Sequence, residues 1–159
     1  TPLPPLPHAA FEATACVLNG RLYVMGGANC NKLQVLEMSE ENGFSWTVKA
    51  DIPSAVRYAA ASAVMDGKLW LIGGNDGETA TVLATVAIYD PNTDSWAAGP
   101  ALELPFASTF CGTVHDGEVC LMDGRGTDQS PALAYKGGAW VEVGGGGAPS
   151  RTLTSILLG

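Results

Sequence analysis

The sequence predicts an all-β protein, and three observations support this fold class. Twenty glycines and ten prolines among 159 residues interrupt short apolar runs, as expected where strands are short and turns frequent. No stretch keeps a 3.6-residue apolar period for about a dozen residues, so long amphipathic helices are not expected. An apolar pattern also recurs about every 48 residues, which is typical of repeat proteins whose units pack against one another.

Each repeat begins with a segment that predicts a β-hairpin. The three hairpins turn at Asn19-Gly20, Asp66-Gly67 and Asp116-Gly117, and the turn glycines lie 47 and 50 residues apart. Asn-Gly and Asp-Gly favour two-residue type I′ turns, which need a positive φ at both positions. The strand after each turn, at 22–25, 69–72 and 119–122, is almost entirely apolar. A strand that is apolar on both faces must be covered on both faces, so each hairpin is expected between neighbouring sheets.

Two further strands are expected in each repeat, which gives four strands per unit. In the second repeat, a strand over 84–89 is followed by a turn at 90–94 and by a strand that opens at Ser95-Trp96. The corresponding strands are expected at 33–37 and 46–49 in the first repeat, and at 132–135 and 140–143 in the third. Trp46, Trp96 and Trp140 stand at the starts of the last strands, so we expect them in the core.

This order of features resembles the Kelch repeat. The second repeat matches it best, with Arg57, Gly67, Gly73-Gly74, Tyr89-Asp90-Pro91 and Trp96. The resemblance implies a Kelch-type β-propeller, in which each repeat forms one four-stranded antiparallel blade. The chain would then hold three such blades and a candidate first strand of a fourth.

The other two repeats depart from the Kelch pattern. The first keeps Gly26-Gly27 and Trp46 but lacks Tyr-Asp-Pro, and the third has Asp123-Gly124 in place of the glycine pair. These departures weaken any transfer of function and leave the fold prediction intact, because the turns and strands recur in order.

The repeats predict five segments. We expect a Pro-rich lead-in over 1–10, blades over 11–50, 51–100 and 101–147, and the start of a fourth repeat over 148–159. A propeller ring has about four to eight blades, so three blades leave two apolar faces open. Three interpretations follow: a piece of a longer propeller, one half of a homodimer that closes a ring of about six blades, or a subunit whose open faces another protein covers.

Charge and composition exclude several function classes. The net charge of −8 argues against nucleic-acid binding, which needs a basic face. No apolar run approaches the roughly 20 residues of a membrane span, and no secretory signal stands at the front. The four cysteines lack the spacing of a disulfide framework, and Cys30, in a loop, is expected to be the most exposed thiol. Free thiols favour a cytoplasmic location.

No catalytic residue, cofactor or metal is predicted. The sequence contains neither a Cys-x-x-Cys nor a His-x-x-x-His spacing, which are typical of metal-ligand sets. Its two histidines, His8 and His115, lie far apart, in the lead-in and at a hairpin turn, so a metal site is not expected. No Gly-x-Ser-x-Gly nucleophile elbow is present. A propeller enzyme that acts on a sugar or small metabolite stays an alternative, because further blades could supply a catalytic pair.

The resemblance assigns partner binding to one loop face. In Kelch adaptor proteins, the loops after each second strand and the connections into each first strand line the face that binds a protein partner. The residues assigned in this way are Arg57, Tyr58, Asn75, Asp76, Glu78, Arg125 and Arg151. Two alternatives stay open: Arg57 and Arg151 could pack only against loop carbonyls, and Asp76 and Glu78 could be solvated turn residues. The sequence thus predicts a non-catalytic protein-interaction module, with a structural subunit of a larger assembly as a further alternative.

Overall fold

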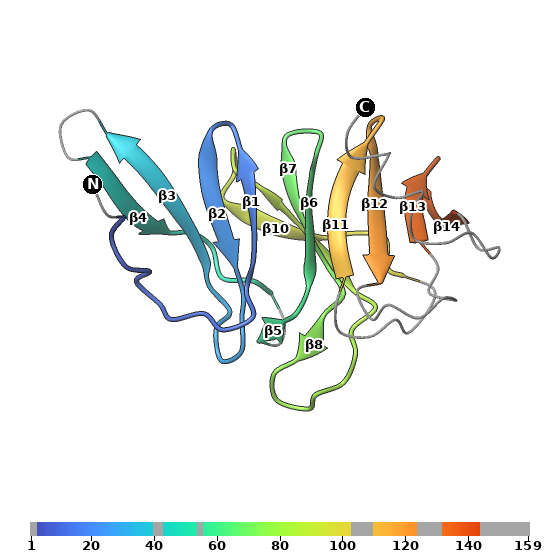
Figure 1. Ribbon diagram of the computed structural model, residues 1–159, viewed down its shortest axis with the longest axis horizontal. Coiled ribbons are helices and arrows are strands. Elements are labelled where there is room, and N and C mark those ends of the chain that lie inside the picture. Colours follow the sequence, from blue (N-terminus) through green and yellow to red (C-terminus); the bar gives the residue numbers. More distant parts are fainter. Residues whose placement is uncertain (1–2, 40–42, 54–55, 103–109, 124–131, 144–159) are drawn as a thin grey trace.

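Fourteen β-strands carry the fold in the computed structural model, which describes residues 3–39, 43–53, 56–102, 110–123 and 132–143. Twelve of them form three four-stranded antiparallel sheets, the blades (Figure 1). Blade 1 consists of β1 (Thr14–Leu18), β2 (Arg21–Met25), β3 (Leu33–Ser39) and β4 (Gly43–Val48). Blade 2 consists of β6 (Ala61–Met65), β7 (Lys68–Ile72), β9 (Val86–Asp90) and β10 (Ser95–Ala98). Blade 3 consists of β11 (Phe110–His115), β12 (Glu118–Asp123), β13 (Ala132–Lys136) and β14 (Ala139–Val143).

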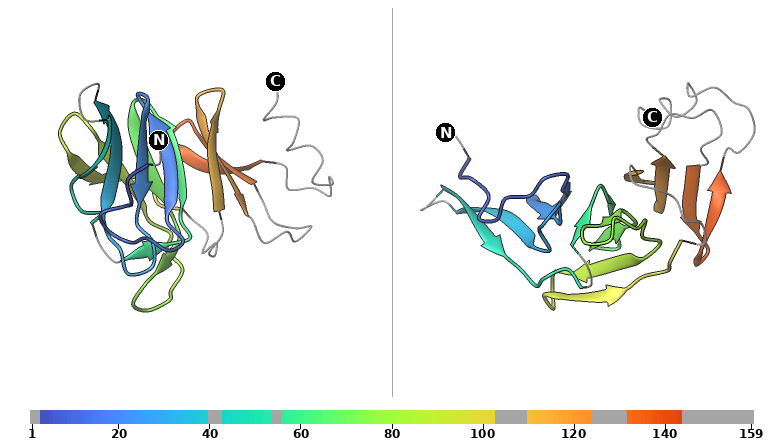
Figure 2. Two further views of the ribbon diagram at one scale, coloured as in Figure 1. Left: turned by 60° about the vertical axis from the view of Figure 1, so that its left-hand side comes forward. Right: turned by 90° about the horizontal axis from the view of Figure 1, so that it is seen from below.

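Within each blade, strands that follow one another in sequence are neighbours in the sheet. The three blades follow one another along an arc, with β1, β6 and β11 on its concave side (Figure 2). The remaining two strands, β5 (Arg57–Tyr58) and β8 (Asn75–Asp76), pair into a short ribbon outside the blades. The predicted all-β class and the three four-stranded blades are thereby confirmed, whereas the predicted fourth repeat lies outside the described residues.

The hairpin turns have the predicted type I′ conformation. Asp66 and Gly67 both have positive φ values, of 52° and 69°, and the turns at Asn19-Gly20 and Asp116-Gly117 show the same signs. Some strand boundaries differ from the prediction: β3 ends at Ser39 rather than at residue 37, β4 spans Gly43–Val48 rather than 46–49, and β9 begins at Val86 rather than at residue 84. The backbone before Val86 is engaged elsewhere: the N–H of Leu83 donates to the carbonyl of Gly74, at 2.8 Å.

Apolar cores fill the spaces between successive blades, and β7 shows how. Its residues Leu69 and Leu71 pack toward blade 1, whereas Trp70 and Ile72 pack toward blade 3. Side chains alternate between the two faces of a strand, so a strand covered on both faces needs apolar residues throughout. This explains why the second strand of each hairpin is almost entirely apolar.

Each of the recurring tryptophans binds the segment that enters its own blade. The indole N–H donates to a backbone carbonyl in all three blades: Trp46 to Pro4 at 2.9 Å, Trp96 to Ala50 at 2.9 Å, and Trp140 to Pro100 at 2.8 Å. Trp96 and Trp140 also pack against the two inter-blade cores, as predicted. Because the lead-in supplies the carbonyl for Trp46, it occupies the place on blade 1 that the connecting segments occupy on blades 2 and 3.

The lead-in is also held by a buried glutamine. The amide of Gln34 accepts a hydrogen bond from the backbone N–H of His8 at 2.8 Å and donates to the carbonyl of the same residue at 2.9 Å. Farther along, the N–H of Ala28 donates to the carbonyl of Phe11 at 2.7 Å. The lead-in therefore lies against blade 1 over most of its length.

Ala59 adopts a backbone conformation that favours glycine, and this leads to a prediction. Its φ is 50°, and its N–H donates to the carbonyl of Glu12 at 3.0 Å. A Cβ in the left-handed region costs roughly 1 kcal/mol, which glycine avoids, although glycine also gives the unfolded chain more freedom. We expect Ala59→Gly to raise the free energy of unfolding by about 0.5 kcal/mol in urea titrations, whereas Ala60→Gly, without a positive φ, should lower it. A loss of stability in Ala59→Gly would contradict the assignment of backbone strain to Ala59.

Candidate functional site

The β5–β8 ribbon brings most of the predicted partner-binding residues together. Its register pairs Arg57 with Asp76 and Tyr58 with Asn75, and Glu78 follows in the same loop. The ribbon lies at the edge of the blades opposite to the three hairpin turns (Figure 1). Arg125 and Arg151, also predicted for this face, lie outside the described residues, so their role stays a prediction.

Arg57 is buried within this cluster, and its side chain is only 2% exposed. Its Nη1 donates to the carbonyls of Thr85 at 3.1 Å and Leu71 at 3.4 Å, and its Nη2 donates to Oγ1 of Thr85 at 2.8 Å. Burial lowers the pKa of the guanidinium. This geometry corresponds to the alternative in which Arg57 packs against neighbouring carbonyls. Asn75 is buried as well, so neither side chain is presented to solvent.

Asp76 is both a turn residue and a surface charge. Its carboxylate accepts hydrogen bonds from the backbone N–H groups of Glu78 at 2.8 Å and Thr79 at 3.0 Å. These bonds hold the pKa of the carboxyl below its usual range, so Asp76 is ionised at neutral pH. The loop thus fixes one negative charge on this edge and adds a second at the exposed Glu78.

An exposed aromatic residue that the sequence analysis did not single out lies next to the ribbon. Phe11 is 70% exposed, and the hydrogen bond between Glu12 and Ala59 holds its segment beside Tyr58. The signal for it was the repeat spacing, because Phe11 precedes Tyr58 by 47 residues and occupies the same position in its blade. We call Phe11, Glu12, Tyr58, Asp76 and Glu78 the ribbon face.

A cavity of about 430 Å³ opens on the concave side of the arc, between the innermost strands. It is lined by three residues from each inner strand: 14–16 of β1, 62–64 of β6 and 112–114 of β11. Hydroxyls meet there, with Oγ1 of Thr14 2.7 Å from Oγ of Ser62. Cys16 is the one titratable side chain in this lining, and burial raises the pKa of its thiol to about 11, against a smaller opposing effect of the hydrogen bond with Ser62. A neutral thiol is a poor nucleophile, so this lining offers little acid–base chemistry.

The raised pKa of Cys16 predicts how stability depends on pH. The folded thiol keeps its proton up to about pH 11, whereas the unfolded thiol ionises near 9.0, so stability is lost as the pH rises from 9 to 11. Two pKa units correspond to about 2.7 kcal/mol. Burial also raises the pKa of Tyr89, so the ionisation of both Cys16 and Tyr89 lowers the stability of the wild type at alkaline pH. We expect the free energy of unfolding of Cys16→Ala, measured by urea titration, to fall less between pH 9 and pH 11 than that of the wild type, by about this amount. An equal fall for both proteins would contradict the raised pKa of Cys16.

The fold and the repeats match known proteins. The family profile described as Kelch motif matches residues 57–103. The chain is also 32% identical to Kelch-like protein 35 of Mus musculus over 127 residues, which cover 76% of this chain and 20% of that protein. The chain belongs to the Kelch-repeat family. The Kelch chain is also 24% identical to the F-box protein AFR of Arabidopsis thaliana, over 98% of its own length and 44% of the relative.

Two more comparisons bear on the extent of the Kelch chain. Kelch repeat and BTB domain-containing protein 13 of Homo sapiens is 29% identical over 147 residues, which cover 87% of this chain and 31% of that protein. The chain spans less than half the length of these curated relatives. The solved structure of YjhT superimposes with a TM-score of 0.75 at 19% identity, over 93% of this chain and 54% of the other, which shows a shared fold.

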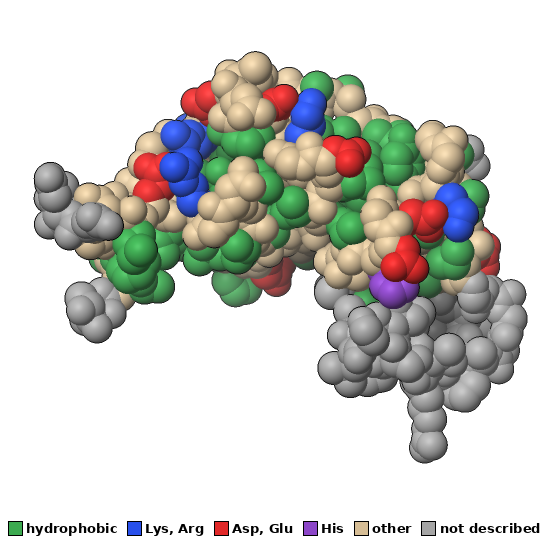
Figure 3. Space-filling view, turned by 90° about the horizontal axis from the view of Figure 1, so that it is seen from above, with side chains coloured by type: hydrophobic (Ala, Val, Ile, Leu, Met, Phe, Trp, Pro, Cys, Tyr) green, Lys and Arg blue, Asp and Glu red, His purple; other side chains and the backbone are tan. Residues whose placement is uncertain are grey.

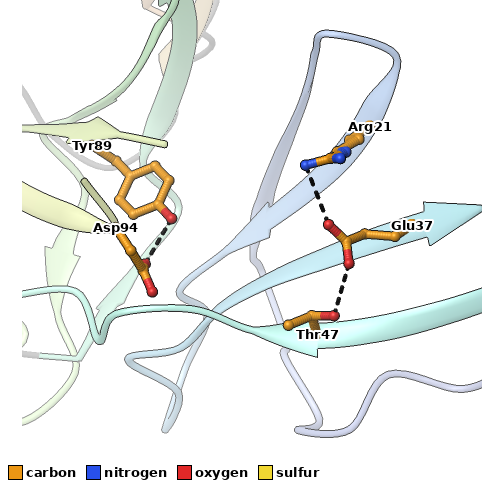
Figure 4. Close-up of polar contacts among 5 residues, drawn as sticks. All are labelled: Arg21, Glu37, Thr47, Tyr89 and Asp94. Atoms are coloured by element: carbon orange, nitrogen blue, oxygen red, sulfur yellow. Dashed lines mark hydrogen bonds and ion pairs between the residues drawn. The ribbon is translucent and has the colours of Figure 1, made fainter. Parts of the chain in front are cut away.

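Polar contacts within blade 1 and within blade 2 of the Kelch chain are structural in character (Figure 4). The hydroxyl of Tyr89 donates to Asp94 at 2.7 Å, and the same carboxylate oxygen accepts the N–H of Ala50 at 2.9 Å. On blade 1, Arg21 forms an ion pair with Glu37 at 3.3 Å. Viewed from the hairpin side, acidic and basic side chains are interspersed (Figure 3), so this side carries no patch of a single charge among the described residues.

The prediction that Cys30 is the most exposed thiol is wrong. The N–H of Cys30 donates to the carbonyl of Gly27 at 3.0 Å, which turns the loop back onto the blade and buries the side chain. Within the ranges that the structure describes, no group of three or more His, Cys, Asp or Glu side chains is arranged to hold a metal ion. Nor does the described part of the chain contain a helix that is long and apolar enough to cross a membrane.

Proposed function

We propose that this Kelch chain is a non-catalytic, cytoplasmic protein-interaction module that binds a protein partner through the ribbon face. The observation that carries the proposal is the exposure of the Phe11 ring beside the half-buried Tyr58. Large aromatic side chains at the surface are the usual anchors of protein interfaces. The F-box and BTB names among the relatives support an adaptor role, in which the Kelch part contacts another protein.

The charge of the ribbon face favours a partner that presents basic groups. Glu12 and Glu78 are exposed on the ribbon face and Asp76 is half-buried there, whereas Arg57, the partner of Asp76 in the ribbon, is buried. Opposite charges at the rim of an interface speed association and contribute to specificity, and added salt weakens the attraction between these charges. Binding through the ribbon face should therefore become weaker as the ionic strength rises.

Replacement of Phe11 tests the proposal. The immobilised chain is used to capture proteins from cell extract, and the captured partner is then titrated against purified variants. We expect Phe11→Ala to weaken binding about tenfold or more, which corresponds to about 1.4 kcal/mol. Val114→Ala, which truncates an exposed valine near the hairpin turns of blade 3, is the matched control and should bind like the wild type. Equal binding by Phe11→Ala and the wild type would contradict the proposal.

We also propose that a second copy of the chain is one of its protein partners and closes a ring of about six blades. The observation that favours it is a set of exposed apolar side chains on the side of blade 1 that points away from blade 2, where Met38 is 74% exposed and Val17 is 62% exposed. Exposed apolar patches of this kind mark interaction surfaces. The chain would then act in part as a structural subunit of its own assembly.

A further inference from the structure

The loop between the second and third strands is longer in blade 2 than in blade 1. Five residues (28–32) join Gly27 to β3, whereas eleven residues (75–85) join Gly74 to β9. The two glycines are equivalent, because they lie 47 residues apart, as do the hairpin-turn glycines of the two blades. Blade 2 therefore carries six extra residues in this loop. The corresponding loop of blade 3 lies outside the described residues.

Three backbone hydrogen bonds at the end of the loop are the same in both blades, which locates the extra residues. In blade 1 they run from Cys30 to Gly27 at 3.0 Å, from Ile52 to Asn31 at 2.8 Å and from Gly26 to Lys32 at 3.1 Å, and in blade 2 from Leu83 to Gly74 at 2.8 Å, from Leu102 to Ala84 at 2.8 Å and from Gly73 to Thr85 at 3.0 Å, with the N–H donor first in each pair. Residues 30–32 thus correspond to 83–85. Residues 28–29 correspond to 75–76, since Phe11 pairs with Ala28 as Tyr58 pairs with Asn75. The extra residues are therefore 77–82, which we call the inserted loop.

The inserted loop does not serve the blades. Its residues 77–81 are exposed, and none of its residues belongs to either inter-blade core among the described residues. Apart from bonds to its own base, its hydrogen bond within the described part of the chain joins the N–H of Gly77 to the carbonyl of Val56, at 2.7 Å. Figure 1 shows the loop after β8 projecting beyond the blades. In repeat proteins, insertions of this kind usually lie on the face that binds a partner.

Internal contacts nevertheless hold the inserted loop in one shape. The N–H of Asp76 donates to the carbonyl of Thr81 at 2.9 Å, and the N–H of Ala80 donates to the carbonyl of Asp76 at 2.8 Å. The hydroxyls of Thr79 and Thr81 lie 2.7 Å apart. Ala80 has a φ of 55°, which residues with a Cβ rarely adopt. A loop that is ordered before binding loses less conformational entropy on binding, so this loop is suited to recognition.

The chemistry of the inserted loop defines what it can bind. Its charged side chain is Glu78, which is exposed and forms no ion pair within the described residues. The side chains of Thr79 and Thr81 are exposed as well. A rigid projection is complementary to a recess, and the carboxylate of Glu78 is complementary to an Arg or Lys side chain inside it. The partner that fits is therefore a protein with a basic recess.

We infer that the inserted loop determines which protein the ribbon face binds, because it enters a basic recess of that protein. The inference rests on the proposed function and names its specificity-determining segment. The exposed ring of Phe11 then packs against the partner outside the recess, while Glu78 pairs with a cation within it. The Kelch chain supplies the projecting side of this interface and its partner the hollow side.

A variant that lacks residues 77–82 tests the role of the inserted loop. Joining 75–76 to 83–85 gives the loop length of blade 1 and keeps the three shared hydrogen bonds, so the variant should retain the circular dichroism spectrum and the cooperative urea transition of the wild type. The protein that the wild-type chain captures from cell extract is purified and titrated against both chains. We expect the deletion to weaken binding about tenfold or more. Equal binding would overturn the inference.

Glu78→Gln tests the charge of the recess and leaves the length of the loop unchanged. Glu142→Gln, which removes an exposed charge from β14, is the matched control. At about 0.05 M salt we expect Glu78→Gln to bind the captured protein about fivefold more weakly than the wild type, and at about 0.5 M within about twofold, because salt screens the attraction. Glu142→Gln should match the wild type at both. Wild-type affinity of Glu78→Gln at low salt would overturn the basic recess.

Phe11→Ala separates the inference from the proposed function. If Phe11→Ala weakens binding of the captured protein and neither loop variant does, the inserted loop has no part in recognition and the proposed function stands. If both loop variants weaken binding and Phe11→Ala does not, the aromatic anchor of the proposed function is wrong and the inserted loop stands. Capture of no protein by the wild type would overturn both.

Discussion

Gly74→Ala is expected to lower the free energy of unfolding by about 3 kcal/mol or more, because two penalties combine at this position. Gly74 has a φ of 90°, which side chains with a Cβ rarely adopt. A Cβ at this position would also lie 2.7 Å from the carbonyl oxygen of Tyr58 and 2.9 Å from the Cβ of Ala60. Both neighbours belong to the segment that leads into β6, and neither a backbone oxygen nor an alanine Cβ can be moved by a rotamer change, so the clash requires a backbone shift. Urea titrations measure the loss.

Gly67→Ala is the matched control for Gly74→Ala. Gly67 has a similar positive φ of 69°, but a methyl group on its Cα would meet no atom within 4 Å, so its replacement should cost only the conformational penalty of about 1 kcal/mol. The difference in unfolding free energy between the two variants measures the cost of the steric contacts that arise where the ribbon approaches the blade at Gly74. Equal losses would mean that the contacts around Gly74 can relax and do not constrain the residue.

The blades could be predicted from sequence because the signals that define them are local. A turn such as Asp66-Gly67 fixes the hairpin by its own φ preferences, and the alternation of Leu69, Trp70 and Leu71 fixes the side to which each residue points. These signals repeat three times, so weak matches in the first and third repeats are supported by their spacing. Within each blade, the number of strands, their order and the hairpin pairings follow from residues a few positions apart, whereas the β5–β8 ribbon was not predicted.

The ribbon face was only partly predictable, because burial there depends on distant contacts. Arg57 is held by hydrogen bonds to Thr85, which is 28 residues away in sequence and outside any motif. Cys30 is buried by the course of its own loop, and polarity of the flanking residues gave no sign of it. Phe11 carried a usable signal, its spacing from Tyr58, yet its exposure depends on how the lead-in lies on blade 1. Strand patterns do not specify how segments far apart in sequence meet.

Arg57→Ala is expected to destabilise the chain by about 3 kcal/mol, since it removes a buried side chain with three hydrogen bonds. The guanidinium joins the segment before β6 to β7 and to Thr85, which precedes β9. No ion pair is formed by Arg57 within the described part of the chain, and its buried Nε has no hydrogen-bond partner there, so the carbonyl and hydroxyl contacts carry its stabilising role. Thermal and urea unfolding measure the loss.

Arg57→Lys separates the role of the fork-shaped guanidinium from the role of its charge. Lysine keeps the positive charge and an apolar stem, but its single ammonium cannot replace two nitrogens, of which Nη1 binds the carbonyls of Leu71 and Thr85 and Nη2 binds Oγ1 of Thr85. We therefore expect a loss of about 1–2 kcal/mol. Because Arg57 is buried, folded Arg57→Lys should bind the ribbon-face partner within about twofold of the wild type, a difference of about 0.4 kcal/mol. If Arg57→Lys kept its stability and lost the partner, Arg57 would be a contact residue, and its burial would have to be relieved on binding.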